Sequence, residues 1–118
     1  MKFDRYTVIL LTLRDDAPVL DEAEAAALQD RHLAHGANMQ ERGLVLARGP
    51  LLDQDDERFR GFSVWSVDPE TARQHAEADP AVQIGRLAVN VMTWMMPAGN
   101  LTFTKVHPPR STSEATDD

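Results

Sequence analysis

Two residues far apart in the chain, His32 and Asp79, have the side-chain types that could transfer a proton together. A histidine gains and loses a proton near neutral pH, since its ordinary pKa is about 6.5. An aspartate beside it can hold the imidazole in one tautomer and stabilise its charged form. Each residue also has a structural explanation: a histidine packed between helix and sheet, and an aspartate before Pro80 at a helix end. They form a site only if the fold brings them together.

Apolar spacing places His32 on a long helix. Asp21, followed three residues later by Glu24, is typical of a capping box, and the predicted helix runs from residue 21 to residue 42 before it stops at Gly43. At about 100° per residue, His32 falls within the apolar stripe of this helix. The stripe faces a sheet, so the imidazole is expected at the helix–sheet boundary.

Asp79 is predicted to end a second, shorter helix. Asp68 is a suitable N-cap and Pro69 a suitable first residue, and the helix must stop before Pro80. The runs of β-branched and apolar residues that predict strands are 5–13, 44–47, 61–67 and 86–96. The resulting β-α-β-β-α-β order predicts an α+β protein with the ferredoxin-like fold, in which an antiparallel sheet carries both helices on one face.

The predicted strands are apolar on both faces, which indicates a second covering layer. Tyr6, Val8 and Leu10 alternate with Thr7, Ile9 and Leu11 in the first strand. Two helices cover only one face of a four-stranded sheet. A second copy of the chain, packed sheet to sheet, is the simplest cover for the other face, and the sequence therefore predicts a homodimer.

The C-terminal part of the chain has a different composition. Residues 1–97 contain all the predicted core elements and are expected to form one domain, with 98–118 as an extension. Residues 101–106 alternate in character and could add an edge strand. The rest, 108–118, has almost no apolar residues and predicts a disordered tail.

Composition narrows the classes of function. The formal net charge of -7 over 118 residues argues against nucleic-acid binding, which needs a basic surface. The chain has no cysteine, which removes disulfides and thiolate chemistry and is compatible with the cytoplasm. The apolar run 8–11 is too short to span a membrane and reads as a buried strand. A protein that acts on small molecules fits these features.

Other polar and aromatic residues leave alternatives open. His35 lies one turn from His32 and could bind a metal ion with it, although no HExxH pattern and no carboxylate ligands accompany the pair. Arg48 could bind an anionic substrate or could be an ordinary surface residue. Trp94 and Met92 could belong to the core, to a dimer interface or to an apolar pocket.

The ordered set of short motifs resembles the YciI-like (YCII-related) family, within the dimeric α/β barrel proteins. The stretches that carry the resemblance are His32-Leu33, Gly43-Leu44, Ala47-Arg48-Gly49-Pro50, Glu77-Ala78-Asp79-Pro80, and Gly85-Arg86-Leu87 leading to Thr93-Trp94. The resemblance implies a ferredoxin-like homodimer with a cleft in each subunit. It also implies that His32 and Asp79 are the active-site pair and that Gly49 and Pro50 shape the cleft wall. Arg48 departs from the family pattern, in which small residues are commoner.

One branch of the family resembles dehydrochlorinases, and related barrels include muconolactone isomerases. The resemblance therefore implies a cofactor-independent lyase or isomerase in which His32 transfers the proton and Asp79 orients it. Arg48 would hold a substrate carboxylate, with Trp94 in the apolar wall. A non-catalytic dimer that binds a small molecule is the second hypothesis, and a metal- or heme-dependent relative that uses His35 with His32 is the third.

Overall fold

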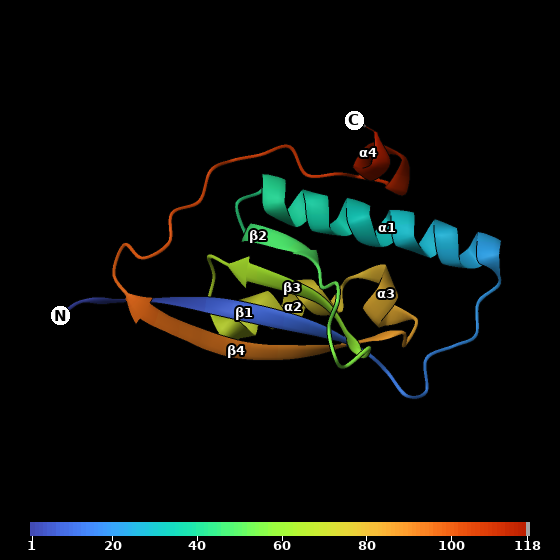
Figure 1. The fold of residues 1–118 in the computed structure, drawn as a ribbon, viewed down its shortest axis with the longest axis horizontal. Coiled ribbons are helices and arrows are strands. Elements are labelled where there is room, and N and C mark those ends of the chain that lie inside the picture. The colour runs from blue at the N-terminus through green and yellow to red at the C-terminus, as the bar shows by residue number, and fades with distance from the viewer. Residues whose placement is uncertain (118) are drawn as a thin grey trace.

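One antiparallel sheet organises the protein, and three of the helices pack on one side of it. The structure is a computed structural model that describes residues 1–117, so Asp118, the last residue of the predicted tail, lies outside it. The elements are β1 (Phe3–Leu13), α1 (Glu22–Glu41), β2 (Val45–Pro50), β3 (Phe59–Trp65), α2 (Pro69–Glu77), α3 (Pro80–Gln83), β4 (Leu87–Pro97) and α4 (Thr112–Thr116). Figure 1 shows this arrangement, with the long antiparallel pair β1 and β4 at the lower edge.

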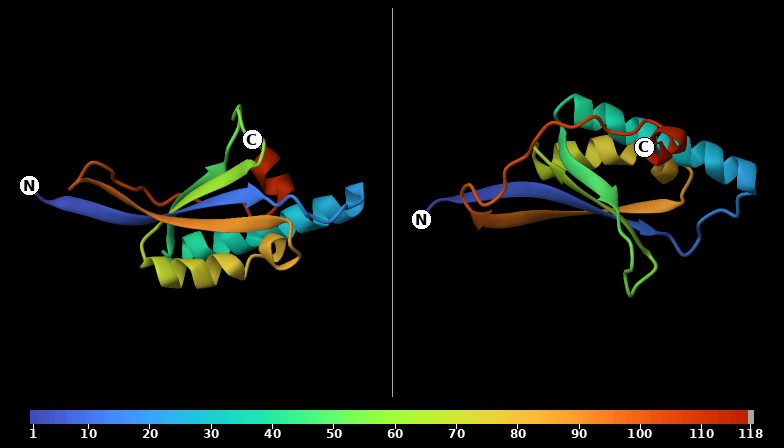
Figure 2. Two further views of the ribbon diagram at one scale, coloured as in Figure 1. Left: turned by 90° about the horizontal axis from the view of Figure 1, so that it is seen from below. Right: turned by 45° about the horizontal axis from the view of Figure 1, so that its top comes forward.

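The strand order in the sheet is β2-β3-β1-β4, and every neighbouring pair is antiparallel. Figure 2 shows α1, α2 and α3 together on one side of the sheet. This confirms the predicted α+β, ferredoxin-like fold. The core between the two layers consists of buried residues from both: Ile9, Met39, Val45, Trp65, Ala72 and Ala76.

Local signals set the start and end of α1 as the sequence predicts. The Asp21 carboxylate accepts a hydrogen bond from the Glu24 backbone N–H at 2.8 Å, and the Glu24 carboxylate accepts one from the Asp21 N–H at 3.3 Å. Gly43, with φ of 78°, takes the left-handed conformation that ends the helix. Asp68 caps α2 in a similar way.

The end of α2 differs from the prediction. The helix stops at Glu77, and Asp79 is the N-cap of a separate short helix, α3. The reason lies in Pro80, which cannot continue a helix but suits the first position of a new one. Asp79 therefore starts a helix instead of ending one.

The C-terminal extension also differs from the prediction. Residues 101–106 form no strand, and the segment beyond them contains α4. After β4 the chain turns at Gly99, which has a positive φ, and crosses toward α1, as Figure 1 shows. Phe103 packs edge-on against Tyr6 with ring centroids 5.5 Å apart, and Pro108 is buried.

Two β-bulges change the register of the sheet. Val45 pairs with Trp65 but Ala47 pairs with Val64, which leaves Leu46 as an extra residue in β2. In the same way Leu11 pairs with Gly61 but Thr12 pairs with Phe59, which leaves Arg60 as an extra residue in β3. A bulge reverses the side to which the following residues point.

Candidate active site

His32 and Asp79 are in direct contact, although 47 positions separate them in the chain. The His32 Nδ1 lies 2.6 Å from the Asp79 Oδ2. A carboxylate can only accept a hydrogen bond, so the Nδ1 carries the hydrogen and donates it. The Nε2 of His32 is then the nitrogen left to exchange a proton with a ligand.

The start of α3 holds Asp79 in place. The second carboxylate oxygen of Asp79, Oδ1, accepts a hydrogen bond from the Ala81 backbone N–H at 2.9 Å. Asp79 is only 5% exposed, and its buried carboxylate is therefore satisfied on both oxygens. One residue caps a helix and orients the imidazole at the same time.

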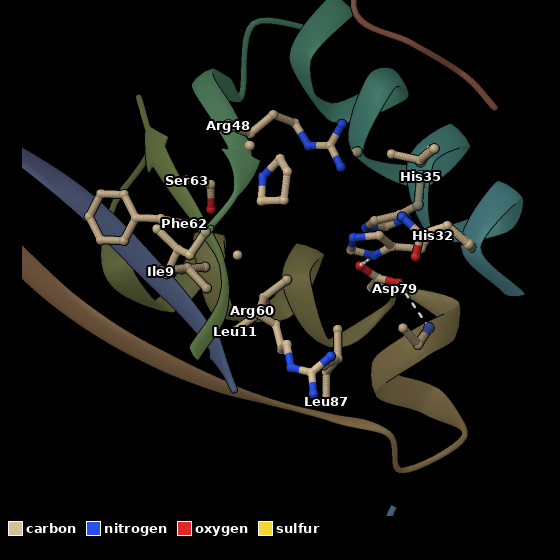
Figure 3. A pocket seen from close by; sticks show the side chains of 18 of the residues that line it. Ile9, Leu11, His32, His35, Arg48, Arg60, Phe62, Ser63, Asp79 and Leu87 are labelled. Carbon is tan, nitrogen blue, oxygen red and sulfur yellow. Dashed lines mark hydrogen bonds and ion pairs between the residues drawn. The ribbon is translucent and has the colours of Figure 1, made fainter. Parts of the chain in front are cut away.

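His32 borders a cavity of about 830 Å³ between α1, the sheet and α3. This volume is typical of sites for small organic molecules. Figure 3 shows His32 and Asp79 at one side of this space and the strands β1 and β3 at the other. Apolar residues of the sheet and of α1 supply much of the wall: Ile9, Leu11, Leu33, Met39 and Leu87.

Arg48 lines the same cavity, and a glycine makes room for it. A Cβ atom at Gly36 of α1 would overlap the Arg48 guanidinium, so any other residue there would displace the guanidinium from its present position. Burial lowers the pKa of Arg48 from its ordinary value, and the negative charge of Asp79 opposes this change. Arg48 stays charged in spite of its burial, and it lies within the field of the His32–Asp79 pair.

The other residues predicted for substrate binding divide into two groups. Gly49 and Pro50 line the cavity beside Arg48, at the end of β2. Trp94, expected in the same wall, is instead 43% exposed on the opposite face of the sheet. The reason is strand alternation: Trp94 pairs with Tyr6, whereas Val91 pairs with the core residue Ile9 and faces the helices.

Several cavity residues were not found by sequence reasoning. Arg60 and Arg86 line the cavity together with Ser63, whose hydroxyl accepts a hydrogen bond from the buried Trp65 indole N–H at 2.7 Å. Arg86 lies in the Gly85-Arg86-Leu87 stretch of the family resemblance, which implied no role for it, and no short motif marks Arg60 or Ser63. The only signal in the sequence is their place near the ends of predicted strands, and it does not distinguish them from ordinary surface residues.

His35 also borders the cavity, but its contacts differ from those of His32. The His35 Nε2 lies 2.9 Å from the His75 carbonyl oxygen, to which it donates. This hydrogen bond joins α1 to α2. Within residues 1–117, no group of three or more histidine, aspartate and glutamate side chains is placed to hold a metal ion.

The C-terminal extension closes one side of the cavity. Pro109, Thr112 and Ala115 belong to the lining. The Thr112 backbone N–H donates to the Asp30 carboxylate of α1 at 2.8 Å, and Arg110 forms an ion pair with Glu41 at the end of the same helix. The extension is thus attached to α1 at two places and forms part of the wall.

Comparison with known proteins gives a family match and a distant structural likeness. Residues 7–95 match the family described as YCII-related domain. No curated protein matches the chain. Among solved structures, the fold is similar to that of the 5-chloro-2-hydroxyhydroquinone dehydrochlorinase TftG from Burkholderia phenoliruptrix AC1100, solved as a complex with 2,5-dihydroxybenzoquinone. That comparison has a TM-score of 0.49 and 20% identity, and it covers 75% of this chain and 92% of the other.

In the part of the chain that the structure describes, no helix has the length and apolar character needed to cross a membrane.

The Asp79→Asn variant tests whether the carboxylate sets the tautomer of His32. Asparagine caps a helix about as well as aspartate, so α3 is retained. We expect neutral His32 to carry its hydrogen on Nδ1 in the wild type and to shift toward the Nε2-protonated form in the variant, as measured by ¹⁵N chemical shifts of the imidazole. The exposed His107 serves as an internal control. A wild-type His32 protonated on Nε2 would contradict the assignment.

The Asp30→Ala variant tests the attachment of the C-terminal extension. Without the Asp30 carboxylate, the Thr112 N–H loses its partner, and the short helix α4 opens more often. We expect faster amide hydrogen exchange across α4 and faster acylation of His32 by diethyl pyrocarbonate, both followed by mass spectrometry. Asp55→Ala, a change in the exposed β2–β3 connection, is the matched control. Equal rates in the two variants would mean that the extension does not cover the cavity.

Proposed function

Because the chain belongs to the YCII-related domain family, we propose that it is a cofactor-independent lyase or isomerase that acts on a small anionic organic molecule. The observation that carries this proposal is the 2.6 Å contact between His32 and Asp79 at the wall of a cavity large enough for such a substrate. The contact leaves one imidazole nitrogen for proton transfer.

The reaction begins with removal of a proton from a substrate carbon next to a carbonyl group. The His32 Nε2 takes this proton, and its imidazole becomes positively charged. The negative charge of Asp79 stabilises that form through the Nδ1–H hydrogen bond, as in other His–Asp pairs. The electron pair of the broken C–H bond moves into an enolate.

Two outcomes follow from the same enolate. In an isomerase the proton on the Nε2 returns to a different carbon of the substrate. In a lyase the electron pair forms a carbon–carbon double bond and expels a leaving group as an anion, while the proton passes from His32 to solvent. Arg48 can bind a carboxylate and so fix the position of the substrate against His32, with Gly49 and Pro50 as the adjoining wall.

A binding protein without catalysis is the second candidate. The size and mixed polarity of the cavity support it as well as they support an enzyme. The two candidates differ in what His32 does: in a binder its replacement changes affinity only, and in an enzyme its replacement slows proton transfer.

We also propose that the chain forms a homodimer through the face of the sheet that the helices leave open. On this face Met92 is 45% exposed and Trp94 is 43% exposed, next to the apolar Leu10 and Phe62. The helices lie on the other side of the sheet (Figure 2), so a second copy would remove these side chains from water. This arrangement corresponds to a dimeric α/β barrel.

The test of catalysis compares the wild type with His32→Gln. Both proteins are incubated in D₂O with a panel of small keto acids and enol lactones, and deuterium incorporation and product formation are followed by NMR. We expect His32→Gln to lower the rate by about 10²–10⁴-fold, because general acid–base catalysis contributes this much. His107→Gln, which changes an exposed histidine, should keep the wild-type rate.

The two candidate functions separate clearly in this experiment. Turnover that survives in His32→Gln would remove His32 from the mechanism. Ligands that bind without any exchange or product in the wild type would favour the binding protein.

The homodimer is tested by light scattering during size-exclusion chromatography. We expect the wild type to have twice the mass of the chain at micromolar concentration and Trp94→Glu to have the mass of one chain, because a buried unpaired carboxylate opposes association. Val19→Glu, a change at a fully exposed position, is the control. A monomeric wild type would contradict the proposal.

A further inference from the structure

Three arginines, Arg48, Arg60 and Arg86, line the candidate active site. This local charge contrasts with the whole chain, in which 19 acidic residues outnumber 12 lysines and arginines. Two carboxylates, Asp53 and Asp79, also border the cavity. Asp79 is already bonded to His32 and to the Ala81 N–H, and Asp53 is exposed in the β2–β3 connection.

The cavity arginines lack acidic partners within the described part of the chain. In residues 1–117, the arginines that form ion pairs are Arg14, Arg58, Arg73 and Arg110. Among the described residues, none of the three cavity arginines forms an ion pair with a carboxylate within 4 Å. Arg60 donates its Nε–H to the Glu57 carbonyl oxygen at 2.6 Å, which leaves the terminal nitrogens free of carboxylates. Arg48 and Arg86 are half-buried, whereas Arg60 is exposed. A guanidinium without a carboxylate partner at the wall of a cavity favours the binding of an anion.

The two bulges of the sheet direct two of these side chains. The Leu46 bulge places Arg48 opposite Ser63, on the helix side of the sheet; without it, alternation from the core residue Val45 would place Arg48 on the other side. Arg60 is itself the extra residue of the second bulge. Bulges beside active sites commonly redirect a side chain in this way.

The arginines lie at two ends of the cavity. Arg48 is opposite Ser63, and Ser63 is three residues from Arg60 along β3, which corresponds to roughly 10 Å along the sheet. Arg86 directly precedes β4, whose first residue, Leu87, pairs with Leu13 at the end of β1. Arg60 lies at the start of β3, which pairs with the same end of β1. Arg86 and Arg60 are therefore at the same end of the sheet. In Figure 3, Arg48 lies above the His32–Asp79 pair and Arg60 lies below it.

We infer that the substrate is a small dianion with an anionic group at each end, most simply a dicarboxylate, a conclusion that rests on the proposed function of the same site. One carboxylate binds Arg48, and the other binds Arg60 with Arg86. The carbon chain between them crosses the apolar wall formed by Ile9 and Leu11 and passes His32. The planar guanidinium matches a carboxylate with two parallel hydrogen bonds, which fixes the orientation of each end. Binding at both ends holds a central carbon beside the Nε2 of His32.

Isothermal titration calorimetry with linear dicarboxylates tests this inference. The probes are succinate, glutarate and adipate, with the monoanion hexanoate as the matched compound that has the carbon chain of adipate and one carboxylate. We expect one dicarboxylate to bind about tenfold or more tightly than hexanoate, and the difference to shrink at high salt. Equal affinity for the best dicarboxylate and for hexanoate would overturn the inference.

Variants assign the two ends. Arg60→Gln and Arg48→Gln should each weaken the dicarboxylate about tenfold and bring its affinity close to that of hexanoate. Arg58→Gln, a change two residues from Arg60 in a side chain paired with Asp56, should keep the wild-type affinity. Gly36→Ala displaces the Arg48 guanidinium without removing its charge and should also weaken binding. Wild-type affinity in both Arg60→Gln and Gly36→Ala, with each variant folded by circular dichroism, would exclude the two-ended site.

The titration is independent of proton transfer. It is repeated on His32→Gln, in which dicarboxylate binding should persist while the exchange of deuterium is lost. If His32→Gln loses catalysis but still prefers the dicarboxylate to hexanoate, the result supports the two-ended anion site, whichever reaction the wild type catalyses. A catalytic wild type without that preference overturns it and leaves the role of His32 intact.

Discussion

The hydrogen bond between His32 and Asp79 is the contact on which the candidate site depends. It joins the middle of α1 to the start of α3. In the sequence these two helices are separated by β2, β3 and α2. Asp79 can make it only because Pro80 starts a new helix there and because the Ala81 N–H holds the other carboxylate oxygen. The N-cap residue of a short helix thus determines which nitrogen of the His32 imidazole carries the hydrogen.

The sheet contributes charged side chains to the candidate site, and the helices contribute His32 and Asp79. Regular alternation would divide the side chains of β2 and β3 evenly between the two faces, and it would direct Arg48 away from α1. The Leu46 and Arg60 bulges break that alternation. They place basic side chains in the cavity of an acidic protein, and Gly36 leaves the space that one of them occupies. The proposed binding of an anion depends on these three local irregularities together.

The two faces of the sheet differ in what packs against them. The helix side contains the core, the His32–Asp79 pair and the cavity. The other side carries Tyr6, Met92 and Trp94, and Phe103 of the extension packs on Tyr6 there. The same extension goes on to close the cavity through Pro109 and Thr112. Residues outside the family match at 7–95 therefore complete the wall of the site.

The sequence by itself determined the order of the elements and most of their ends. Capping residues, glycine stops and apolar periodicity depend on neighbours within a few positions, so Asp21, Gly43 and Asp68 could be interpreted without a structure. It also pointed to His32 and Asp79, through residue types and family resemblance. Only the tertiary structure decided that the two are in contact, that Trp94 lies on the other face, and that Arg60 and Arg86 join the site. The reason is physical: contacts between distant elements depend on how the helices pack on the sheet. At a bulge the following side chains also move by one position, and one position in a strand is the difference between its two faces.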